Sequence, residues 1–350
     1  MQNKIHNIQA LRGISVLLVI FYHLIPIENK YNPLFVLSPN LFKIGNIGVD
    51  IFFMISGFIM VVVTQNYHKS KISFLKFIYS RFTRIYGPYW FYTLLLLLVY
   101  FIKPEWVNSS QNSEINIISS LLLIPEKNLP LIMVGWSLIH EIYFYIVFSF
   151  FLLFFSKEQI FKFSILWISI LVIGNFYFSI DSPFLDLIFH PLTCEFILGL
   201  FLGVYYLKFP KALINSKFIL FIPFIFLFIA AWFLIGPLHD WERLLVYGGI
   251  SMLIIFSSIE LEKIGFIFNK KLIQIGDASY SIYLSHLLVL NTVAKLFNVF
   301  LIENIIFEII LVISMITASI LWGLFSFKYI ETPLNIFFKN KFSRLNFQAK

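Results

Sequence analysis

Apolar runs long enough to cross a bilayer are the feature of this sequence that most limits how it can fold. They come in blocks of about 17 to 25 residues, the length that an α-helix needs to span a hydrocarbon core of about 30 Å. Apolar residues make up 59% of the 350 positions and charged residues only 13%, about half of their share in a typical soluble domain. We therefore expect a protein whose main solvent is the lipid bilayer.

The same runs decide between helices and a barrel. Backbone polar groups inside hydrocarbon must be hydrogen-bonded within one helix or around a closed β-barrel. Uninterrupted apolar stretches such as 94–101 lack the alternation of polar and apolar residues that a barrel strand shows. We therefore predict an all-α, polytopic integral membrane helical bundle. Its spans, about ten by hydropathy, are predicted near 8–27, 46–66, 85–103, 136–155, 160–180, 187–207, 218–236, 243–259, 279–297 and 303–329.

The apolar segment 117–135 differs from these spans because Pro125, Glu126, Lys127 and Pro130 interrupt it. Proline removes a helical hydrogen-bond donor, and charged side chains are costly in hydrocarbon. We predict that this segment lies at the membrane interface or re-enters the membrane rather than crossing it.

Basic residues indicate the orientation of the bundle. When the spans alternate from an inner N-terminus, most of the 26 lysines and arginines fall on the inner side, which the positive-inside rule assigns to the cytoplasm. We therefore predict both termini in the cytoplasm and a multi-pass protein of the inner (plasma) membrane. The first span contains Arg12 and His23 and lacks a small-residue cleavage site, so we expect it to be retained rather than removed as a signal peptide.

The sequence shows no appended soluble domain. We predict a transmembrane domain over 1–335 and a basic cytoplasmic C-terminal tail over 336–350. The excess of 26 Lys and Arg over 18 Asp and Glu is also found in nucleic-acid-binding proteins, but in a membrane chain it marks cytoplasmic loops. We expect the lipid bilayer and no nucleic acid among the partners, and the sequence leaves the oligomeric state open.

Several kinds of site are excluded. Cys194 is the only cysteine, so the sequence rules out an intramolecular disulfide framework and a multi-cysteine metal site. It also lacks the His-Glu-x-x-His zinc helix, the Gly-x-x-x-x-Gly-Lys-Ser/Thr phosphate loop and the Gly-x-Ser-x-Gly nucleophile elbow. We expect no metal and no permanently bound cofactor.

Charged side chains inside spans are costly, so each is a functional candidate. Arg12 and His23 both lie in the first span, and at 1.5 Å per residue they are about 16 Å apart along the helix. Histidine can accept and return a proton near neutral pH, as acyl transfer to a hydroxyl requires. The alternative for His23 is an interfacial histidine satisfied by hydrogen bonds.

Three carboxylates lie in the outer halves of predicted spans. Glu141 follows Trp136 by about a turn and a half, at a depth close to that of His23, so it is a candidate partner that orients His23. Alternatively, a hydrogen bond from Glu141 locks two helices together. Asp50 is either part of the site or a helix-terminal acid, and Glu195 is interpreted as a helix-packing residue.

Arg81 and Arg84 lie three residues apart, on one helical face, at the inner mouth of the third span. Their forked donors suit phosphate oxygens, although arginines at a cytoplasmic span end also anchor to lipid headgroups. The segment Tyr-Ser-Ile-Tyr-Leu-Ser-His at 280–286 enters the ninth span from inside. Its polar atoms fall on more than one face, so some must point to protein or to a cavity, and packing is the alternative for each tyrosine.

Together these segments resemble the acyltransferase-3 family of membrane O-acyltransferases over nearly the whole chain. Each piece alone is weak, but five or more in the order and spacing of the family are hard to obtain by chance. The matching pieces are Arg12-x10-His23, Gly48-Val49-Asp50-Ile51-Phe52-Phe53 with Ser56-Gly57-Phe58, Arg81-x-x-Arg84, Trp136-Ser137-Leu138-x-x-Glu141-x-x-Phe144-Tyr145, Tyr280-Ser281-x-Tyr283-Leu284-x-His286 and Glu331-x-Pro333.

The resemblance implies transfer of an acyl group, usually acetyl, from cytoplasmic acyl-CoA to a hydroxyl of a glycan or of a lipid-linked sugar. The compact form resembles the exopolysaccharide-modifying members, so we expect the acceptor to be reached directly or through a separate protein. The resemblance makes His23 the catalytic general base and Glu141 its partner. The donor- or substrate-binding candidates are Arg12, Arg81, Arg84, Asp50, Ser137, Tyr283 and His286.

Two other classes of function compete with an acyltransferase. A transporter or flippase would use the same intramembrane charges to move a sugar-linked substrate, but the paired broken helices of an inverted repeat are not found in the sequence. A purely structural role accounts for the spans and leaves Arg12, His23 and Glu141 without an explanation. The sequence therefore favours the enzyme.

Overall fold

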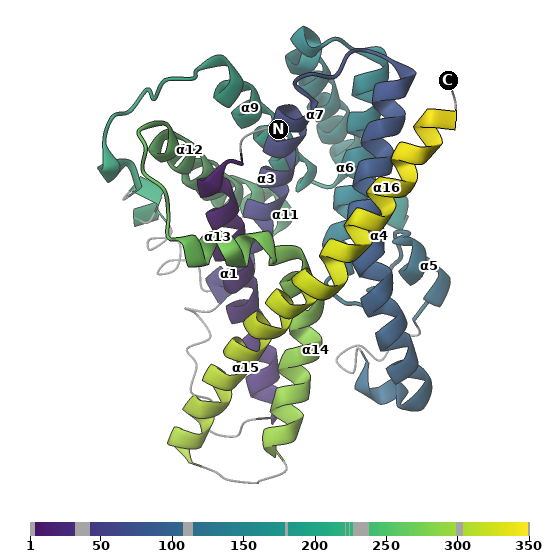
Figure 1. The fold of residues 1–350 in the computed structure, drawn as a ribbon, viewed down its shortest axis with the longest axis vertical. Coiled ribbons are helices and arrows are strands. Elements are labelled where there is room, and N and C mark those ends of the chain that lie inside the picture. Colours follow the sequence, from purple (N-terminus) through teal and green to yellow (C-terminus); the bar gives the residue numbers. More distant parts are fainter. Residues whose placement is uncertain are drawn as a thin grey trace. The chain divides into compact units, whose positions relative to one another are not determined.

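A computed structural model describes residues 4–31, 43–107, 115–178, 181–220, 222–223, 225–226, 238–298 and 304–348. Within these ranges every regular element is a helix and there is no strand, which confirms the all-α prediction (Figure 1). The chain forms two compact units, and each is described by itself. Unit 1 comprises Met1–Thr64 and Cys194–Phe327, and unit 2 comprises Gln65–Thr193 and Lys328–Lys350.

Unit 1 is built around its first helix. The helix α1 contacts α3, α12, α13 and α14. Buried aliphatic side chains of α1, α3, α9 and α12 form one core cluster, in which Leu11, Met54 and Ile255 are almost completely buried. The elements are α1 (His6–Tyr31), the 3-10 helix η1 (Ile44–Asn46), α3 (Ile47–Thr64), α9 (Thr193–Lys208), η4 (Lys217–Leu220), α11 (Asp240–Arg243), the π-helix η5 (Leu244–Gly248), α12 (Gly249–Lys263), α13 (Lys270–Asp277), α14 (Ser279–Asn298) and α15 (Ile305–Ser326).

The N-terminus of α1 is held by side chains from the far end of α12. The carboxylate of Glu262 accepts hydrogen bonds from the backbone N–H groups of His6 and Asn7, both at 2.8 Å. These N–H groups have no partner within the helix, so an acidic side chain satisfies them and also complements the helix dipole. The Asn7 amide donates in turn to the carbonyl oxygen of Phe266 at 2.8 Å. The axial position of α1, and of everything it carries, is therefore set by α12.

Two glycines let α3 and the turn before it approach α1 closely. A Cβ at Gly45 would overlap the carbonyl oxygen of Leu18, and a Cβ at Gly48 would overlap that of Ser15. In a membrane, helices are held together by van der Waals packing and polar contacts rather than by the hydrophobic effect, and small residues permit both. This contact brings Asp50, one turn after η1, beside the middle of α1.

Unit 2 is a bundle in which α4 and α6 run antiparallel. Aromatic pairs join them in reverse order: Phe74 with Phe150, and Phe77 with Phe148 at 5.4 Å between ring centroids. The side chain of Ser70 caps α4 by accepting from the N–H of Ser73 at 3.1 Å. The elements are α4 (Lys71–Ile102), η2 (Pro104–Trp106), α5 (Ile117–Leu122), α6 (Gly135–Phe154), η3 (Lys157–Gln159), α7 (Ile160–Tyr177), α8 (Pro183–Phe189), the π-helix η6 (Phe327–Glu331), which begins at the last residue of unit 1, and α16 (Thr332–Gln348).

The predicted tail 336–350 falls largely within α16. This helix packs on α4, where the hydroxyl of Tyr79 donates to the carbonyl oxygen of Phe338 at 2.9 Å. The C-terminal helix α16 is therefore tied to the same helix that carries Arg81 and Arg84.

Eight helices in the described part are long and apolar enough to cross a membrane. The helix α14 covers the predicted span 279–297 but is more polar than these eight, and the predicted span 218–236 lies mostly outside the described residues. The predicted span 187–207 is divided between α8 and α9, with Pro191 between them. The segment 117–135 contains only one helix before α6, the six-residue α5. This helix is too short to cross a bilayer, so the segment does not span as a helix, as predicted.

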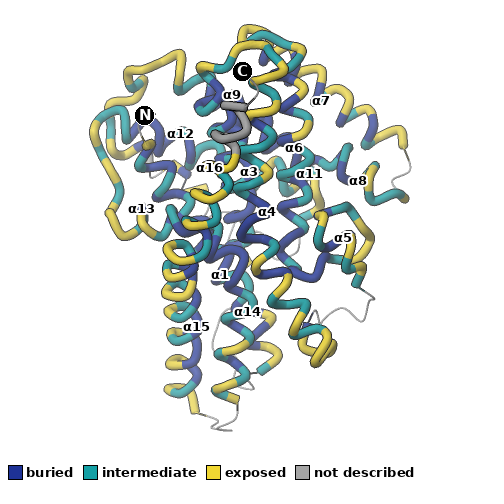
Figure 2. Tube along the Cα trace, turned by 45° about the vertical axis from the view of Figure 1, so that its right-hand side comes forward, coloured by how far each residue is buried: buried dark blue, intermediate teal, exposed yellow. Residues whose placement is uncertain are grey.

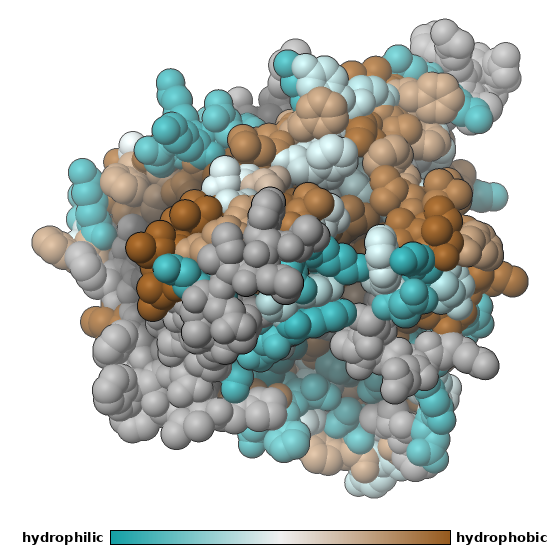
Figure 3. Space-filling view, turned by 90° about the horizontal axis from the view of Figure 1, so that it is seen from below, coloured by the Kyte–Doolittle hydropathy of each residue, from teal (hydrophilic) through white to brown (hydrophobic). Residues whose placement is uncertain are grey.

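The surface carries the apolar side chains expected of a protein in lipid. Leu98, Ile173 and Ile313, on three different helices, are exposed, and Figure 3 shows hydrophobic residues in brown over wide parts of the described surface. In the most apolar window of each helix, 56% of the residues are buried in α1 and 28% in the stretch Ile305–Lys341. Figure 2 shows exposed bands along α15. The chain is therefore a membrane protein in which α1 is an inner helix and α15 a peripheral one of unit 1.

Candidate active site

Two histidines from distant parts of the sequence meet in unit 1. His23 lies in the second half of α1 and His286 in the first half of α14, and Nε2 of His286 is 3.2 Å from Nδ1 of His23. Each ring also contacts a backbone carbonyl of its own helix. Nδ1 of His23 is 2.9 Å from the oxygen of Val19, and Nδ1 of His286 is 2.6 Å from the oxygen of Tyr283. His286 is completely buried, whereas His23 is partly exposed.

These contacts assign the tautomer of both rings. A carbonyl oxygen only accepts, so in neutral imidazoles Nδ1 of each ring carries the proton. Nε2 of His286 then holds a lone pair, and the Nδ1–H of His23 is shared between this lone pair and the oxygen of Val19. Nε2 of His23 is left with its own lone pair. That atom is the proton acceptor that a general base requires.

Aromatic side chains surround the histidine pair. The ring of Tyr283 lies 5.8 Å from His286 and 6.1 Å from Phe52 of α3, measured between centroids, and Tyr283 is itself buried. The hydroxyl of Ser285 donates to the carbonyl oxygen of Ser281 at 2.8 Å. Tyr283, Ser285 and His286 therefore point into the protein, as the sequence indicated for some of the polar side chains of 280–286.

A buried ion pair lies close to the histidines. Asp50 is fully buried, and its two oxygens accept from Nε and Nη2 of Arg243 at 2.8 and 2.9 Å. Glu195 lies beside this pair, and Tyr22, the neighbour of His23, lies near the same guanidinium. Sequence reasoning selected Asp50 and missed Arg243, although a buried carboxylate in a span requires a cationic partner. Arg243 sits at the start of the predicted span 243–259.

Arg12 remains on the same helix as His23. It is half-buried, and its Nη1 lies 3.4 Å from the side-chain oxygen of Gln9. Because α1 is helical from His6 to Tyr31, the rise of about 16 Å between Arg12 and His23 follows directly from helix geometry.

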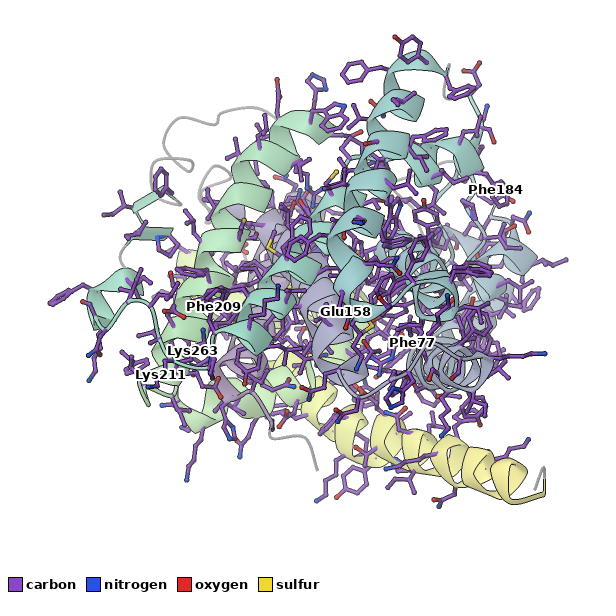
Figure 4. All side chains as sticks on the ribbon, turned by 90° about the horizontal axis from the view of Figure 1, so that it is seen from above. Phe77, Glu158, Phe184, Phe209, Lys211 and Lys263 are labelled. Carbon is purple, nitrogen blue, oxygen red and sulfur yellow. The ribbon has the colours of Figure 1, made fainter. Side chains whose placement is uncertain are left out.

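The second group of candidates lies in unit 2, between α4 and α6. The guanidinium carbon of Arg81 is 6.0 Å from the ring centroids of both Phe77 and Tyr145. The hydroxyl of Tyr145 donates to Glu141 at 2.5 Å. Phe77 lies among closely packed rings in Figure 4. Nε of Arg81 reaches only the hydroxyl of Ser80, at 3.4 Å, and Nη1 is buried without a hydrogen-bond partner among the described residues.

This arrangement corrects the predicted depth of the arginines. The sequence placed Arg81 at the mouth of the third span and Glu141 near the opposite surface, yet both contact or neighbour Tyr145. The reason is that α4 begins at Lys71, ten residues before Arg81, because Ser70 caps it there. Lysines in this first part of the helix lowered its hydropathy and hid it from the span prediction. Arg81 therefore lies about 15 Å inside its helix.

The two remaining candidates lie in unit 2 as well. Arg84 follows Arg81 on the same face of α4, is half-buried and makes no hydrogen bond with the described residues. Ser137, in the first turn of α6, is buried, and its hydroxyl donates to the carbonyl oxygen of Val134 at 3.0 Å.

The structure thus brings the candidates together in two groups. Unit 1 holds His23 with His286 and Tyr283, and nearby Asp50 with Arg243. Unit 2 holds Arg81 with Glu141. The predicted pairing of Glu141 with His23 joins residues of different units and stays a prediction.

Comparison with known proteins identifies the family. The family model Acyl_transf_3, described as an acyltransferase domain, matches residues 5–324. The exopolysaccharide production protein ExoZ of Rhizobium meliloti (strain 1021) is 29% identical over 268 residues, which cover 73% of this chain and 79% of ExoZ. The O-acetyltransferase OatA of Staphylococcus aureus (strain NCTC 8325 / PS 47) is 24% identical over 94% of this chain and 57% of OatA, so the chain spans little more than half of that relative.

No solved structure matches the chain. The family match covers both groups of candidate residues, from the start of α1 to nearly the end of α15. It therefore confirms the resemblance that the motifs carried, and the chain belongs to the acyltransferase-3 family of membrane acyltransferases.

Proposed function

We propose that this protein transfers an acyl group, most simply acetyl, from acyl-CoA to a hydroxyl of a cell-surface polysaccharide or of its lipid-linked precursor. The names of the relatives ExoZ and OatA, an exopolysaccharide production protein and an O-acetyltransferase, support this acceptor class and this group. The observation that carries the proposal is the hydrogen bonding of His23, which leaves the lone pair of Nε2 available on a partly exposed side chain.

In the proposed reaction the acceptor hydroxyl oxygen attacks the carbonyl carbon of the thioester. Nε2 of His23 takes the hydroxyl proton as the new C–O bond forms. The C–S bond then breaks, and the thiolate of CoA leaves with the proton that His23 returns. Nε2 of His286 accepts a hydrogen bond from the Nδ1–H of His23 throughout the reaction. This lone pair and the carbonyl oxygen of Val19 stabilise the imidazolium that forms on His23.

Arg81 supports an anionic donor. A buried guanidinium N–H without an acceptor costs free energy, and a phosphate oxygen would satisfy it with a charge-assisted hydrogen bond. Arg84, on the same face of α4, and Arg12, on α1, are further candidates for the phosphates or for the pantetheine arm.

The topology is part of the proposal. The positive-inside distribution supports both termini in the cytoplasm, with the acyl-CoA-binding arginines accessible from that side of the inner (plasma) membrane. The transmembrane domain would then run over 1–335 and the basic residues of 336–350 would lie in the cytoplasm. An acceptor on the outer surface would be acylated without CoA crossing the membrane.

Sealed vesicles of known orientation test this function. Acetyl-CoA carrying a radiolabelled acetyl group is supplied to the cytoplasmic face, with polysaccharide acceptor confined to the opposite face, and we expect label in the acceptor. Label only in acceptor on the same face as the CoA would contradict the transmembrane geometry. Transfer from another acyl donor, with none from acetyl-CoA, would contradict the proposal that acyl-CoA is the donor. Movement of a sugar-linked substrate without consumption of any donor would show a transporter instead.

A further inference from the structure

Glu195 is a buried carboxyl group of unit 1 that the proposed chemistry does not use. Its side chain is completely shielded from solvent, and neither of its oxygens has a hydrogen-bond donor within reach among the described residues. Burial removes the water that stabilises a carboxylate, so buried carboxylates are normally paired or hydrogen-bonded. Glu195 therefore needs a cation or a proton that its protein neighbours do not supply.

Close packing of α9 on α3 brings Glu195 to the Asp50–Arg243 ion pair. A Cβ at Gly57 of α3 would overlap the carbonyl oxygen of Phe196. Small residues permit this approach of two helices in a membrane. Because Glu195 lies in the first turn of α9, next to Phe196, its carboxyl group comes to lie near both members of the ion pair.

The π-helix η5 also lies against Glu195. It begins directly after Arg243, and a Cβ at Gly248, its last residue, would lie 3.4 Å from Oε1 of Glu195. Glycine has no side chain, so this neighbour offers Glu195 no side-chain donor either. π-Helical turns are often found at functional sites, and this one connects two of the groups that surround the ion pair.

Charge balance indicates what Glu195 binds. The guanidinium of Arg243 donates to both oxygens of Asp50, at 2.8 and 2.9 Å, so one positive charge already matches one negative charge. An ionised Glu195 would give the three side chains a net negative charge in a buried place. In the described part of the chain, no group of three or more His, Cys, Asp and Glu side chains could hold a metal ion. A proton is the cation that restores neutrality without further ligands.

Rough magnitudes favour the proton as well. At about pH 7 a glutamate in water prefers the ionised form by a factor of about 500. Full burial of a carboxyl group can change this preference by about 1,000-fold or more toward the protonated form. The first turn of a helix favours the carboxylate, but only by about two- to fivefold. Asp50 and Arg243 act on Glu195 in opposite directions and, as a closed pair, largely cancel.

A proton would also complete the hydrogen bonds of the ion pair. Carboxylates only accept, so Asp50 and Glu195 cannot bond to each other while both are ionised. A protonated Glu195 has an O–H donor. Each oxygen of Asp50 keeps a second lone pair besides the one that Arg243 uses, and it can accept this donor.

We propose that Glu195 binds a proton and, as a neutral acid, donates to Asp50, which completes the buried ion pair with Arg243. The three side chains then form one uncharged unit beside α1, the helix that carries His23. An unbalanced carboxylate there would favour the imidazolium form of His23, which has no lone pair for a hydroxyl proton. Glu195 is in this sense a positioning residue. The consequence for His23 rests on the proposed function, whereas the proton on Glu195 does not.

Few other groups near Glu195 can change charge. Thiols and phenols are ordinarily neutral near pH 7, and arginine stays charged. Between about pH 5 and about pH 8, the two carboxyl groups are therefore the members of this set that can gain or lose a proton. The charged and titratable side chains of the set are Cys194 and Glu195 of α9, Asp50 of α3, Arg243 of α11, Tyr247 of η5 and Tyr22 of α1.

Infrared spectroscopy and thermal unfolding of the purified full chain in detergent micelles test this proposal. Glu195→Gln keeps a donor for Asp50 and has no proton to lose. Asp50→Asn keeps the size of that side chain and removes the anionic partner of Arg243. Glu105→Gln, at an exposed acid of η2, is the matched control.

At about pH 7 we expect the wild type to show the carbonyl stretch of a protonated carboxylic acid, and Glu195→Gln to lose intensity in this band. Asp50→Asn should lose the same intensity, because an ionised Glu195 then becomes the partner of Arg243. The control should keep it. A band that is unchanged in Glu195→Gln overturns the proton. A band that Asp50→Asn retains overturns the link to the ion pair. If Glu195→Gln does not fold, Asp50→Asn decides.

The melting temperature gives a second readout. A proton that Glu195 holds when folded is lost above about pH 4 once the chain unfolds, so the wild type loses stability as the pH rises. Glutamine does not titrate. The melting temperature of Glu195→Gln, relative to the wild type, should therefore rise from about pH 5 to about pH 8. An ionised Glu195 that only holds helices together predicts the opposite trend and would overturn the proposal.

Sodium ions distinguish a metal cation from a proton. We expect them to leave the melting temperature of the wild type and of Glu195→Gln unchanged. If they raise it in the wild type and not in Glu195→Gln, a metal ion occupies the place of the proton and the proposal is overturned. None of these measurements involves acyl transfer, so they remain valid if the proposed function fails.

Discussion

Two partly buried arginines, one in each unit, differ in what surrounds them. Arg243 of unit 1 donates twice to Asp50, at 2.8 and 2.9 Å, so its charge is matched inside the protein. Arg81 of unit 2 is flanked by rings, reaches Ser80 only at 3.4 Å, and keeps Nη1 buried without a partner among the described residues. A matched arginine holds helices together. Glu141 lies near the charge of Arg81, but the buried Nη1 of Arg81 still has free energy to gain from an anionic acceptor. This difference supports the proposal that the acyl donor binds at Arg81.

The histidine pair of unit 1 also has its polar atoms engaged within the protein. In unit 1 each Nδ1 is engaged by a carbonyl, so the reactive Nε2 of His23 is oriented before any substrate arrives. A group that moves protons benefits from such fixed geometry, because no reorganisation is then required during the reaction. Under the proposed function, unit 1 would supply an oriented base and unit 2 a site for an anion.

Replacement of His23 should have the largest effect. The change His23→Ala removes the only base of the proposed mechanism, and we expect acyl transfer to fall roughly 100- to 10,000-fold, the usual contribution of general base catalysis. The change adds no charge to the span, so membrane insertion should be normal. The measurement is kcat in purified vesicles with acetyl-CoA and deacylated polysaccharide. His68→Ala, which removes an exposed histidine of unit 2, is the matched control and should keep full activity. A His23→Ala variant with kcat near the wild type would remove unit 1 from the chemistry.

Replacement of Arg81 should act on the donor. One charge-assisted hydrogen bond contributes about 1.5 to 3 kcal/mol, so Arg81→Ala should raise the KM for acetyl-CoA roughly 10- to 150-fold with little change in kcat. Arg84→Ala should have a smaller effect, because the buried guanidinium nitrogen that lacks a hydrogen-bond partner among the described residues belongs to Arg81 and not to Arg84. Steady-state kinetics over a range of donor concentrations separates the two constants. If Arg81 only packs between Phe77 and Tyr145, the variant will lose thermal stability while its KM for donor stays unchanged.

Much of this division could be predicted from the sequence, because unpaired backbone groups and charges in hydrocarbon cost free energy. Hydrocarbon permits only helices and penalises charge, so the length of the apolar runs predicts the helical fold, and the few charges within them predict His23, Arg12 and Asp50 as candidates. The interruption of 117–135 by prolines and charges likewise predicts a segment that does not span.

The rest depends on contacts that no local pattern encodes. His23 and His286 are 263 positions apart, and neither periodicity nor spacing relates them. Arg243 stands at the start of the predicted span 243–259, and nothing in the local sequence marks it as the partner of Asp50. Hydropathy started the third span at 85, although the Ser70 cap lets α4 begin at Lys71 and so places Arg81 three turns inside the helix. Capping and tertiary pairing, not hydropathy, decided these positions.

His286 tests whether the base is oriented or merely present. It touches no reacting atom, so it is a positioning residue, and His286→Ala should lower kcat about tenfold, the value of one neutral hydrogen bond of about 1 to 1.5 kcal/mol. The KM for acetyl-CoA should not change. Glutamine at this position can both donate to the carbonyl oxygen of Tyr283 and accept from His23, so His286→Gln should restore most of the lost kcat. A packing role would give equal losses in both variants, together with a lower melting temperature.

Glu141 tests whether the two units cooperate, and its effect should be the smallest. Glu141→Gln keeps the size of the side chain and replaces a charge-assisted hydrogen bond from Tyr145 by a neutral one, a difference of about 1 kcal/mol or roughly fivefold in a rate or binding constant. The direction of the effect carries the information. If Glu141 orients His23, as the sequence predicted, kcat falls and the KM for donor stays constant. If Glu141 acts only within unit 2 by keeping Tyr145 beside Arg81, the KM for acetyl-CoA changes and kcat does not. In the first case the double variant Glu141→Gln with His23→Ala is no slower than His23→Ala alone, because the partner has nothing left to orient. In the second case, Glu141→Gln has no further effect on the KM for acetyl-CoA once Arg81 is replaced by alanine. The proposed base in unit 1 and the proposed anion site in unit 2 would then act without coupling through Glu141.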